Sequence, residues 1–111
     1  MKDDAFILDF MLTRIARIHE FTEGKRELFY HSALVQSAVL RELHVLTDAS
    51  KHLSALAKRS MGEVMWREMM GFRNFLVHDY LGDLNLDIVW AAIEGKLDNL
   101  TQQLNQYRST L

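Results

Sequence analysis

The chain has 111 residues, 49% of them hydrophobic and 25% charged, which is ordinary for a single globular domain with one core. The net charge of -2 argues against a protein that coats nucleic acid non-specifically, because such binding needs many Lys and Arg side chains against phosphates. The absence of cysteine excludes disulfides, thiolate metal sites and a cysteine nucleophile. No apolar run approaches the ~20 residues of a membrane helix, and the acidic N-terminus is unlike a secretory signal. We therefore expect one cytoplasmic domain over residues 1–111.

The first half of the chain contains two segments with helical periodicity. Hydrophobic residues recur at spacings of three and four over residues 3–20, which is typical of an amphipathic helix, and Gly24 is expected to end it. Residues 35–56 keep this spacing as one long segment, with Glu42 the single polar residue on its apolar face. The stretch 51–59 contains Lys and Arg side chains and no acid, and indicates either a local basic patch or a helix end that favours cations.

The second half of the chain contains two more such segments. Residues 60–62 are expected to form a turn, and the helix that follows has an apolar face made of Met65, Met69, Phe72 and Leu76. Residues 82–83 interrupt the pattern again. Asn85 is a suitable N-cap with Asp87 in the first turn of a last helix over 86–107. No segment alternates like a strand, and the connections are short, so we predict an all-α fold, an up-and-down antiparallel four-helix bundle.

Residues 73–80 (RNFLVHDY) hold the densest set of chemically useful side chains. Arg73 is a permanent cation, His78 belongs to the residue type that titrates near neutral pH, and Tyr80 is a phenol. These three groups suit chemistry on a phosphodiester. An Arg five residues before a His is common by chance in a chain with five histidines, and the tyrosine two residues later makes the pattern more specific.

The spacing of these residues on an ideal helix limits what one chain can do. Arg73 and His78 lie about 140° apart around the helix axis, and both are expected to point away from the core face. They can meet at one phosphate if the helix ends near His78, or if a second copy of the chain approaches from the other side. Each residue alone also has a structural explanation: a surface ion pair for Arg73, a helix C-terminus for His78 and an interface for Tyr80. The candidate partners of Arg73 in such a surface ion pair are Glu63, Glu68 and Asp79.

This motif, followed by Gly82 and the run LDIVW at 86–90, resembles the HEPN superfamily. Within it, the chain is similar to the HepT branch of small all-α toxins, whose signature is Arg-x4-His-x-Tyr. The segments WREMMGF at 66–72 and AVLREL at 38–43 are also similar to family segments, so the resemblance covers roughly residues 35–93. The chain departs from the family where it reads Thr-Asp-Ala at 47–49 instead of the common Gly-Glu-Ala. It also has Met65 where a proline is often found.

The resemblance implies a homodimer in which the motifs of both protomers line one cleft. It implies a metal-independent endoribonuclease without a cofactor, acting on RNA, with tRNA the expected target. Under that interpretation Arg73 stabilises the charged phosphorane and His78 transfers protons, while Asn74 and Tyr80 support these two residues or contact the RNA. The resemblance also implies an antitoxin, a minimal nucleotidyltransferase of the MntA type, which transfers AMP from ATP onto Tyr80.

Two other functions compete with this one. The chain could be a non-catalytic HEPN subunit that binds substrate for a minimal nucleotidyltransferase, although retention of the Arg and the His favours the nuclease. It could also be a helical oligomer in which the motif only stabilises an interface. Metal-dependent hydrolysis has little support, because no two of the five histidines are three or four residues apart.

Overall fold

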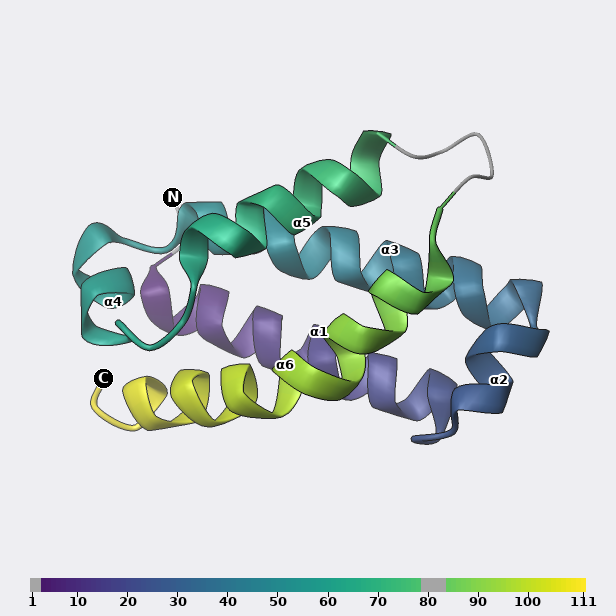
Figure 1. Cartoon of the computed structure of the whole chain (residues 1–111). Coiled ribbons are helices and arrows are strands. Elements are labelled where there is room, and N and C mark those ends of the chain that lie inside the picture. The colour runs from purple at the N-terminus through teal and green to yellow at the C-terminus, as the bar shows by residue number, and fades with distance from the viewer. Residues whose placement is uncertain (1–2, 79–83) are drawn as a thin grey trace.

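The computed structural model describes residues 3–78 and 84–111, and the regular structure within these ranges is entirely helical. The helices are α1 (Asp4–Thr22), α2 (Arg26–His31), α3 (Ala33–Ala49), the 3₁₀ helix η1 (Ser50–His52), α4 (Ala55–Ser60), α5 (Trp66–His78) and α6 (Leu86–Arg108) (Figure 1). The predicted all-α class is confirmed. Among the helices described, none is both long enough and apolar enough to cross a bilayer.

The ends of several helices follow directly from the local sequence. Asn85 caps α6 as predicted, because its side-chain oxygen accepts the backbone N–H of Asp87 at 2.9 Å. Ser32 caps α3 in the same way, through the N–H of Val35 at 3.1 Å. α1 ends in the left-handed region at Glu23 (φ 52°) and is followed by Gly24 (φ 70°), so the predicted break at this glycine is confirmed.

The expectation of one continuous helix over residues 35–56 is wrong. α3 ends at Ala49, the backbone becomes extended at Leu53, and α4 begins two residues later. The Ser50 hydroxyl donates to the carbonyl of Thr47 at 2.6 Å, and the Ser54 side chain caps α4 through the N–H of Ala57 at 3.0 Å. Serine side chains that bond to nearby backbone offer an alternative to the helical ladder, so apolar spacing alone did not reveal this break. The short helix α2 was likewise not anticipated.

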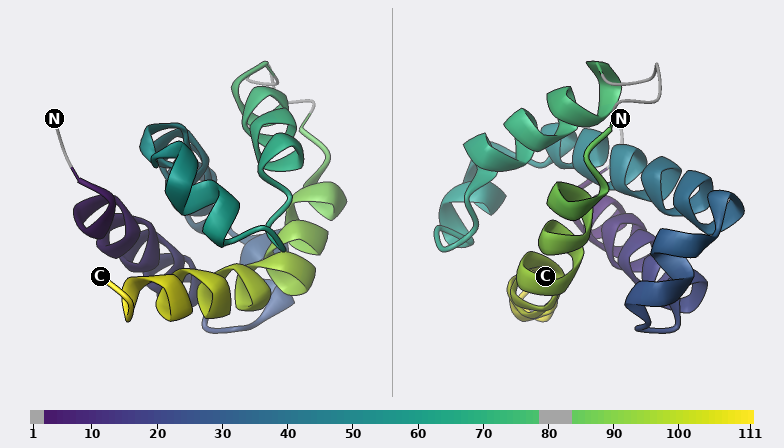
Figure 2. Two further views of the ribbon diagram at one scale, coloured as in Figure 1. Left: turned by 90° about the vertical axis from the view of Figure 1, so that its left-hand side faces the viewer. Right: turned by 45° about the vertical axis from the view of Figure 1, so that its right-hand side comes forward.

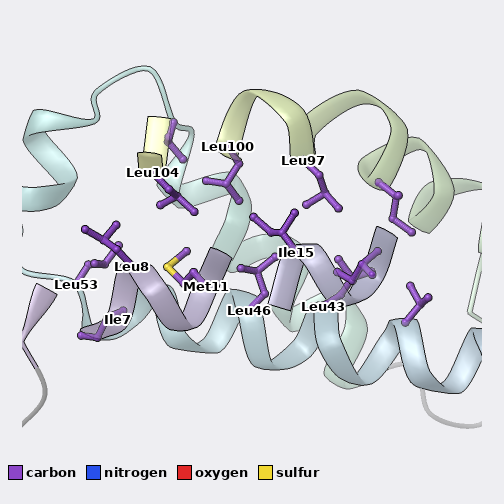
Figure 3. Packing of buried hydrophobic residues seen from close by; sticks show 14 of the residues in the cluster. Ile7, Leu8, Met11, Ile15, Leu43, Leu46, Leu53, Leu97, Leu100 and Leu104 are labelled. Carbon is purple, nitrogen blue, oxygen red and sulfur yellow. The ribbon is translucent and has the colours of Figure 1, made fainter. Parts of the chain in front are cut away.

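The core lies where α1, α3 and α6 meet. Figure 3 shows side chains of Leu8, Met11 and Ile15 from α1 packed among residues of the other two helices. The apolar faces predicted for the first and last helices are buried, which confirms both assignments. The labelled partners of the α1 residues are Leu43, Leu46, Leu97, Leu100 and Leu104.

Glu42, the polar residue on the apolar face of α3, is buried and makes two ion pairs to α1. Its carboxylate oxygens lie 3.3 Å from Arg14 Nη1 and 3.7 Å from Arg17 Nη1. A charge at this depth is tolerated only when it is paired, and α1 supplies both cations. The polar position therefore helps to set how α1 and α3 pack.

Phe29 anchors α2 to the core and gives a test of the fold. Its fully buried ring stacks on Trp90 with the centroids 5.7 Å apart. We expect Phe29→Ala to lower the free energy of unfolding by about 3–5 kcal/mol, because it leaves a cavity at this stack. Urea denaturation measures the change. The matched control Leu34→Ala, at a side chain 80% exposed, should change it by about 0.5 kcal/mol or less. Equal losses in the two variants would contradict this packing.

α5 is packed on one side only. It runs roughly antiparallel to α3 and contacts it, while its C-terminal end diverges from α3 (Figures 1 and 2), and none of its 13 residues is fully buried. A groove of about 690 Å³ separates α5 from α6, and its walls include Met69, Phe72 and Phe75. Met65, which was expected on the core face, is 60% exposed. The helix that holds the motif therefore presents apolar side chains that the described residues cover only in part.

Candidate active site

Arg73 lies in α5 and is turned toward α3. Its Nη2 is 3.3 Å from Asp48 Oδ1, in the last turn of α3, and its side chain is 27% exposed. Its Nη1 also donates to Asn74 Oδ1 at 3.3 Å. Arg73 was expected to point away from the core face of its helix; the antiparallel packing of α5 instead places this arginine against the end of α3. The partner that the structure describes is neither Glu63 nor Glu68, and Asp79, the third acid named above, lies outside the described residues.

The carboxylate of Asp48 forms ion pairs with two cations. Lys51 Nζ lies 2.9 Å from the same carboxylate oxygen that faces Arg73. The ion pair with Lys51 lowers the pKa of Asp48 below its ordinary value, and the nearby Arg73 and His44 lower it further. A depressed carboxyl pKa means that this pairing stabilises the fold above about pH 4 and is lost as the pH falls through the folded-state pKa. At neutral pH the carboxylate is charged and restrains the Arg73 guanidinium.

His78 is exposed at the last described position of α5. It lies five residues after Arg73, which is about 7.5 Å along the helix axis. The side chain of exposed Asn74, one turn before the histidine, contacts Arg73 rather than His78. Tyr80 lies outside the described residues, as do Asp79 and the expected break at 82–83. The structure therefore places Arg73, Asn74 and His78 on one helix.

Asp48 and Lys51 are the neighbours whose roles the sequence did not reveal. Their spacing of three residues is a signal for a local ion pair. No sequence signal connects either residue to Arg73, which lies far along the chain on another helix. The basic stretch 51–59 is also divided, because Lys51 belongs to this ion-pair cluster while Lys58 and Arg59 lie in the last turn of α4.

Most of the chain is similar to known proteins. A family model described as "HepT-like: Ribonuclease HepT-like" matches residues 11–107, a range that includes the whole of α5. The chain belongs to the HepT-like ribonuclease family. The resemblance inferred from residues 73–80 is thereby confirmed at the level of the family.

Curated relatives of this HepT-like chain have similar names. It is 32% identical over 98 residues to "Probable ribonuclease HepT" of Thermococcus cleftensis, covering 85% of the chain and 86% of that relative. It is 26% identical over 101 residues to "Putative RNase MJ1380" of Methanocaldococcus jannaschii, covering 90% of the chain and 91% of the relative. A third relative, "Gamma-glutamylcyclotransferase and putative RNase MJ0434" of the same organism, is 27% identical, and the match covers 93% of the chain but only 46% of the relative. No solved structure matches the HepT-like chain significantly.

The described part of the HepT-like chain contains no group of three His, Cys, Asp or Glu residues placed to hold a metal ion. The charged groups around Arg73 form ion pairs with one another, with Asp48 between Lys51 and the arginine. What the site offers chemically is a restrained guanidinium and an exposed imidazole on one helix. Such a pair can bind a phosphate and transfer a proton.

Proposed function

We propose that the chain is the toxin of a toxin–antitoxin pair and a metal-independent endoribonuclease that cleaves RNA in the cytoplasm, with tRNA its expected substrate. One observation carries this proposal: α5 holds an accessible His78 and an Arg73 fixed by Asp48, in a chain of a ribonuclease family. A guanidinium held in place needs little reorganisation when charge develops on a phosphate.

In the reaction we propose, the RNA supplies its own nucleophile. His78 accepts the proton of a 2'-hydroxyl, and the 2'-oxygen attacks the adjacent phosphorus. Arg73 stabilises the non-bridging oxygens of the phosphorane with its planar fork of N–H donors. The bond from phosphorus to the 5'-oxygen then breaks, and that oxygen takes up a proton. The products are a 2',3'-cyclic phosphate and a 5'-hydroxyl.

A homodimer would supply the second proton-transfer group. Each chain has one motif histidine, while the base and the acid are two functions, and a two-fold axis would bring the second copy's His78 into the same cleft. The incomplete packing of α5 and the apolar groove beside it support a partner at this side of the molecule. In such a dimer α1, α3, α5 and α6 would serve as the antiparallel four-helix bundle of each protomer.

The antitoxin in this proposal is a nucleotidyltransferase of the MntA type that adds AMP to Tyr80. Modified protein is expected to cleave tRNA at least about tenfold more slowly, because like charges a few ångström apart near a protein surface repel by about 4 kcal/mol. Intact mass and a cleavage gel measure the modification and the activity. A Tyr80→Phe protein treated with the same antitoxin should cleave at the same rate as untreated Tyr80→Phe protein, because it has no hydroxyl to modify. Full activity of a homogeneously modified protein would contradict this regulation.

The experiment that tests the nuclease is incubation of the purified protein with total tRNA in EDTA. Cleavage with 2',3'-cyclic phosphate and 5'-hydroxyl ends is expected, since the chemistry uses only side chains and the 2'-hydroxyl. The mass of the protein must first show that Tyr80 has no AMP attached. Intact tRNA after incubation with unmodified protein would overturn the nuclease and favour the substrate-binding subunit of a nucleotidyltransferase.

Asp48 acts here as a positioning residue for Arg73. We expect Asp48→Asn to lower kcat/KM for RNA cleavage by roughly 10- to 100-fold, because the guanidinium loses the charge that orients it. Asp48→Glu, which keeps a carboxylate, should recover most of this loss. The exposed Asp98 of α6 offers a matched control, and Asp98→Asn should leave the rate unchanged. If Asp48→Asn and Asp98→Asn cleave equally fast, Asp48 does not position the arginine.

A further inference from the structure

A second hollow lies between α1 and α3, next to the ion pair of Arg73. Its volume is about 540 Å³, within the range of small-molecule sites. Asp48, the partner of Arg73, forms part of its wall. The other polar and aromatic residues that line it are Phe6 and Phe10 of α1, Arg41 and His44 of α3, and His52 of η1.

We propose that this hollow binds one nucleoside of a single-stranded RNA whose neighbouring phosphate lies at Arg73. The inference rests on the proposed ribonuclease function and adds to it a site for a base. RNA is recognised most often through unstacked bases that stack on aromatic side chains, with cations nearby for the backbone.

The aromatic residues of α1 suit this role. Phe6 is 49% exposed although it is a large hydrophobic residue, and it lies one helical turn before Phe10. The Arg14 guanidinium lies over the Phe10 ring, 4.8 Å from its centroid, and this contact restrains the ring. A restrained ring beside an exposed one forms an apolar surface onto which a base can stack at a small entropic cost.

The charges around the hollow suit a polyanion. Arg41 is exposed on the rim, and His44 and His52 add two imidazoles. The carboxylate in the wall, Asp48, is already paired with Lys51 and Arg73, so it does not face a ligand as an uncompensated charge. The chain as a whole carries a net charge of -2, whereas in and beside this hollow the cations Arg41, Lys51 and Arg73 outnumber the single carboxylate of Asp48.

The direction of the helices connects the hollow to the candidate active site. Because α5 runs antiparallel to α3, the path from Asp48 through His44 to Arg41 runs in the same direction as the path from Arg73 to His78 (Figure 1). A strand following α5 would therefore pass the mouth of the hollow.

The test compares RNA with and without bases on a protein that cannot cleave. His78→Ala protein is titrated with a fluorescein-labelled oligoadenylate and with its abasic ribose-phosphate counterpart, and binding is followed by fluorescence anisotropy. Adding Phe6→Leu and Phe10→Leu should weaken oligoadenylate binding by about tenfold and leave abasic binding nearly unchanged. Leu34→Ala, at the other end of α3, is the matched control, and circular dichroism checks the fold of every variant.

The outcomes separate this inference from the nuclease itself. Equal weakening for both probes, or no weakening for either, would overturn the base site even if the wild type cleaves tRNA. Selective weakening for oligoadenylate would support the base site, and wild type that leaves tRNA intact would then overturn cleavage alone. If neither probe binds to the His78→Ala protein, the base site is overturned, and cleavage of tRNA by the wild type still decides the nuclease.

Discussion

Replacing His78 with alanine is expected to slow tRNA cleavage by roughly 10²–10⁴-fold, the contribution usual for a general acid–base group. The reduction in rate is expected to be about 10⁴-fold if the second copy's His78 acts in the same cleft. One substitution then removes both the general base and the general acid. Initial rates of tRNA cleavage in EDTA, measured on a gel at saturating protein, give the effect.

The control for this substitution is another exposed histidine at a helix end. His31 closes α2, so His31→Ala makes the same chemical change away from the motif. Both variants should unfold at nearly the same temperature as the wild type, because each removes an exposed side chain. A His78→Ala protein that cleaves tRNA at the rate of His31→Ala would contradict the role of His78 and favour a binding or purely structural function.

Arg73→Lys is expected to lower kcat by about 10²–10³-fold, although the charge is retained. Lysine provides a point charge on a flexible stem, whereas the phosphorane in the proposed mechanism is bound by two N–H donors in a fixed fork. The lysine can still pair with Asp48, so the free energy of unfolding should change by less than about 1 kcal/mol. Single-turnover cleavage and urea denaturation separate these two effects.

Arg67 offers the matched control on the same helix. It is exposed near the start of α5, and Arg67→Lys should leave both the cleavage rate and the stability unchanged. If Arg73→Lys keeps full activity, a positive charge alone is sufficient at this position. The fork would then not be the reason for an arginine there.

Much of the helical structure could be predicted because its causes are local. The apolar spacing in α1 and α6 and the cap at Asn85 depend on neighbours within a turn or two, and all three are present in the structure. The break between α3 and α4 was missed because it depends on hydroxyl bonds of Ser50 and Ser54 that a hydrophobic pattern does not record. A helix break of this kind can be predicted only when the hydrogen bonds of polar side chains are considered together with the hydrophobic pattern.

The candidate site also has one part that depends on local sequence and another that depends on tertiary packing. Arg73, Asn74 and His78 were proposed from the order of residues within one helical segment, and the range matched by the family model includes all three. The sequence also indicated the all-α class, since no segment has strand periodicity. These conclusions require only residues that are close together in the chain.

Only the tertiary structure decided which way Arg73 points and which acid holds it. That contact joins α5 to the end of α3, and it exists because the two helices pack antiparallel with the last turn of α3 beside the middle of α5. The hollow lined by Phe10 and His52 arises in the same manner from separate segments. The sequence identified the candidate side chains but not their partners. Helix packing brings together residues that are far apart in the chain, and the number of residues between them does not predict how close they lie in space.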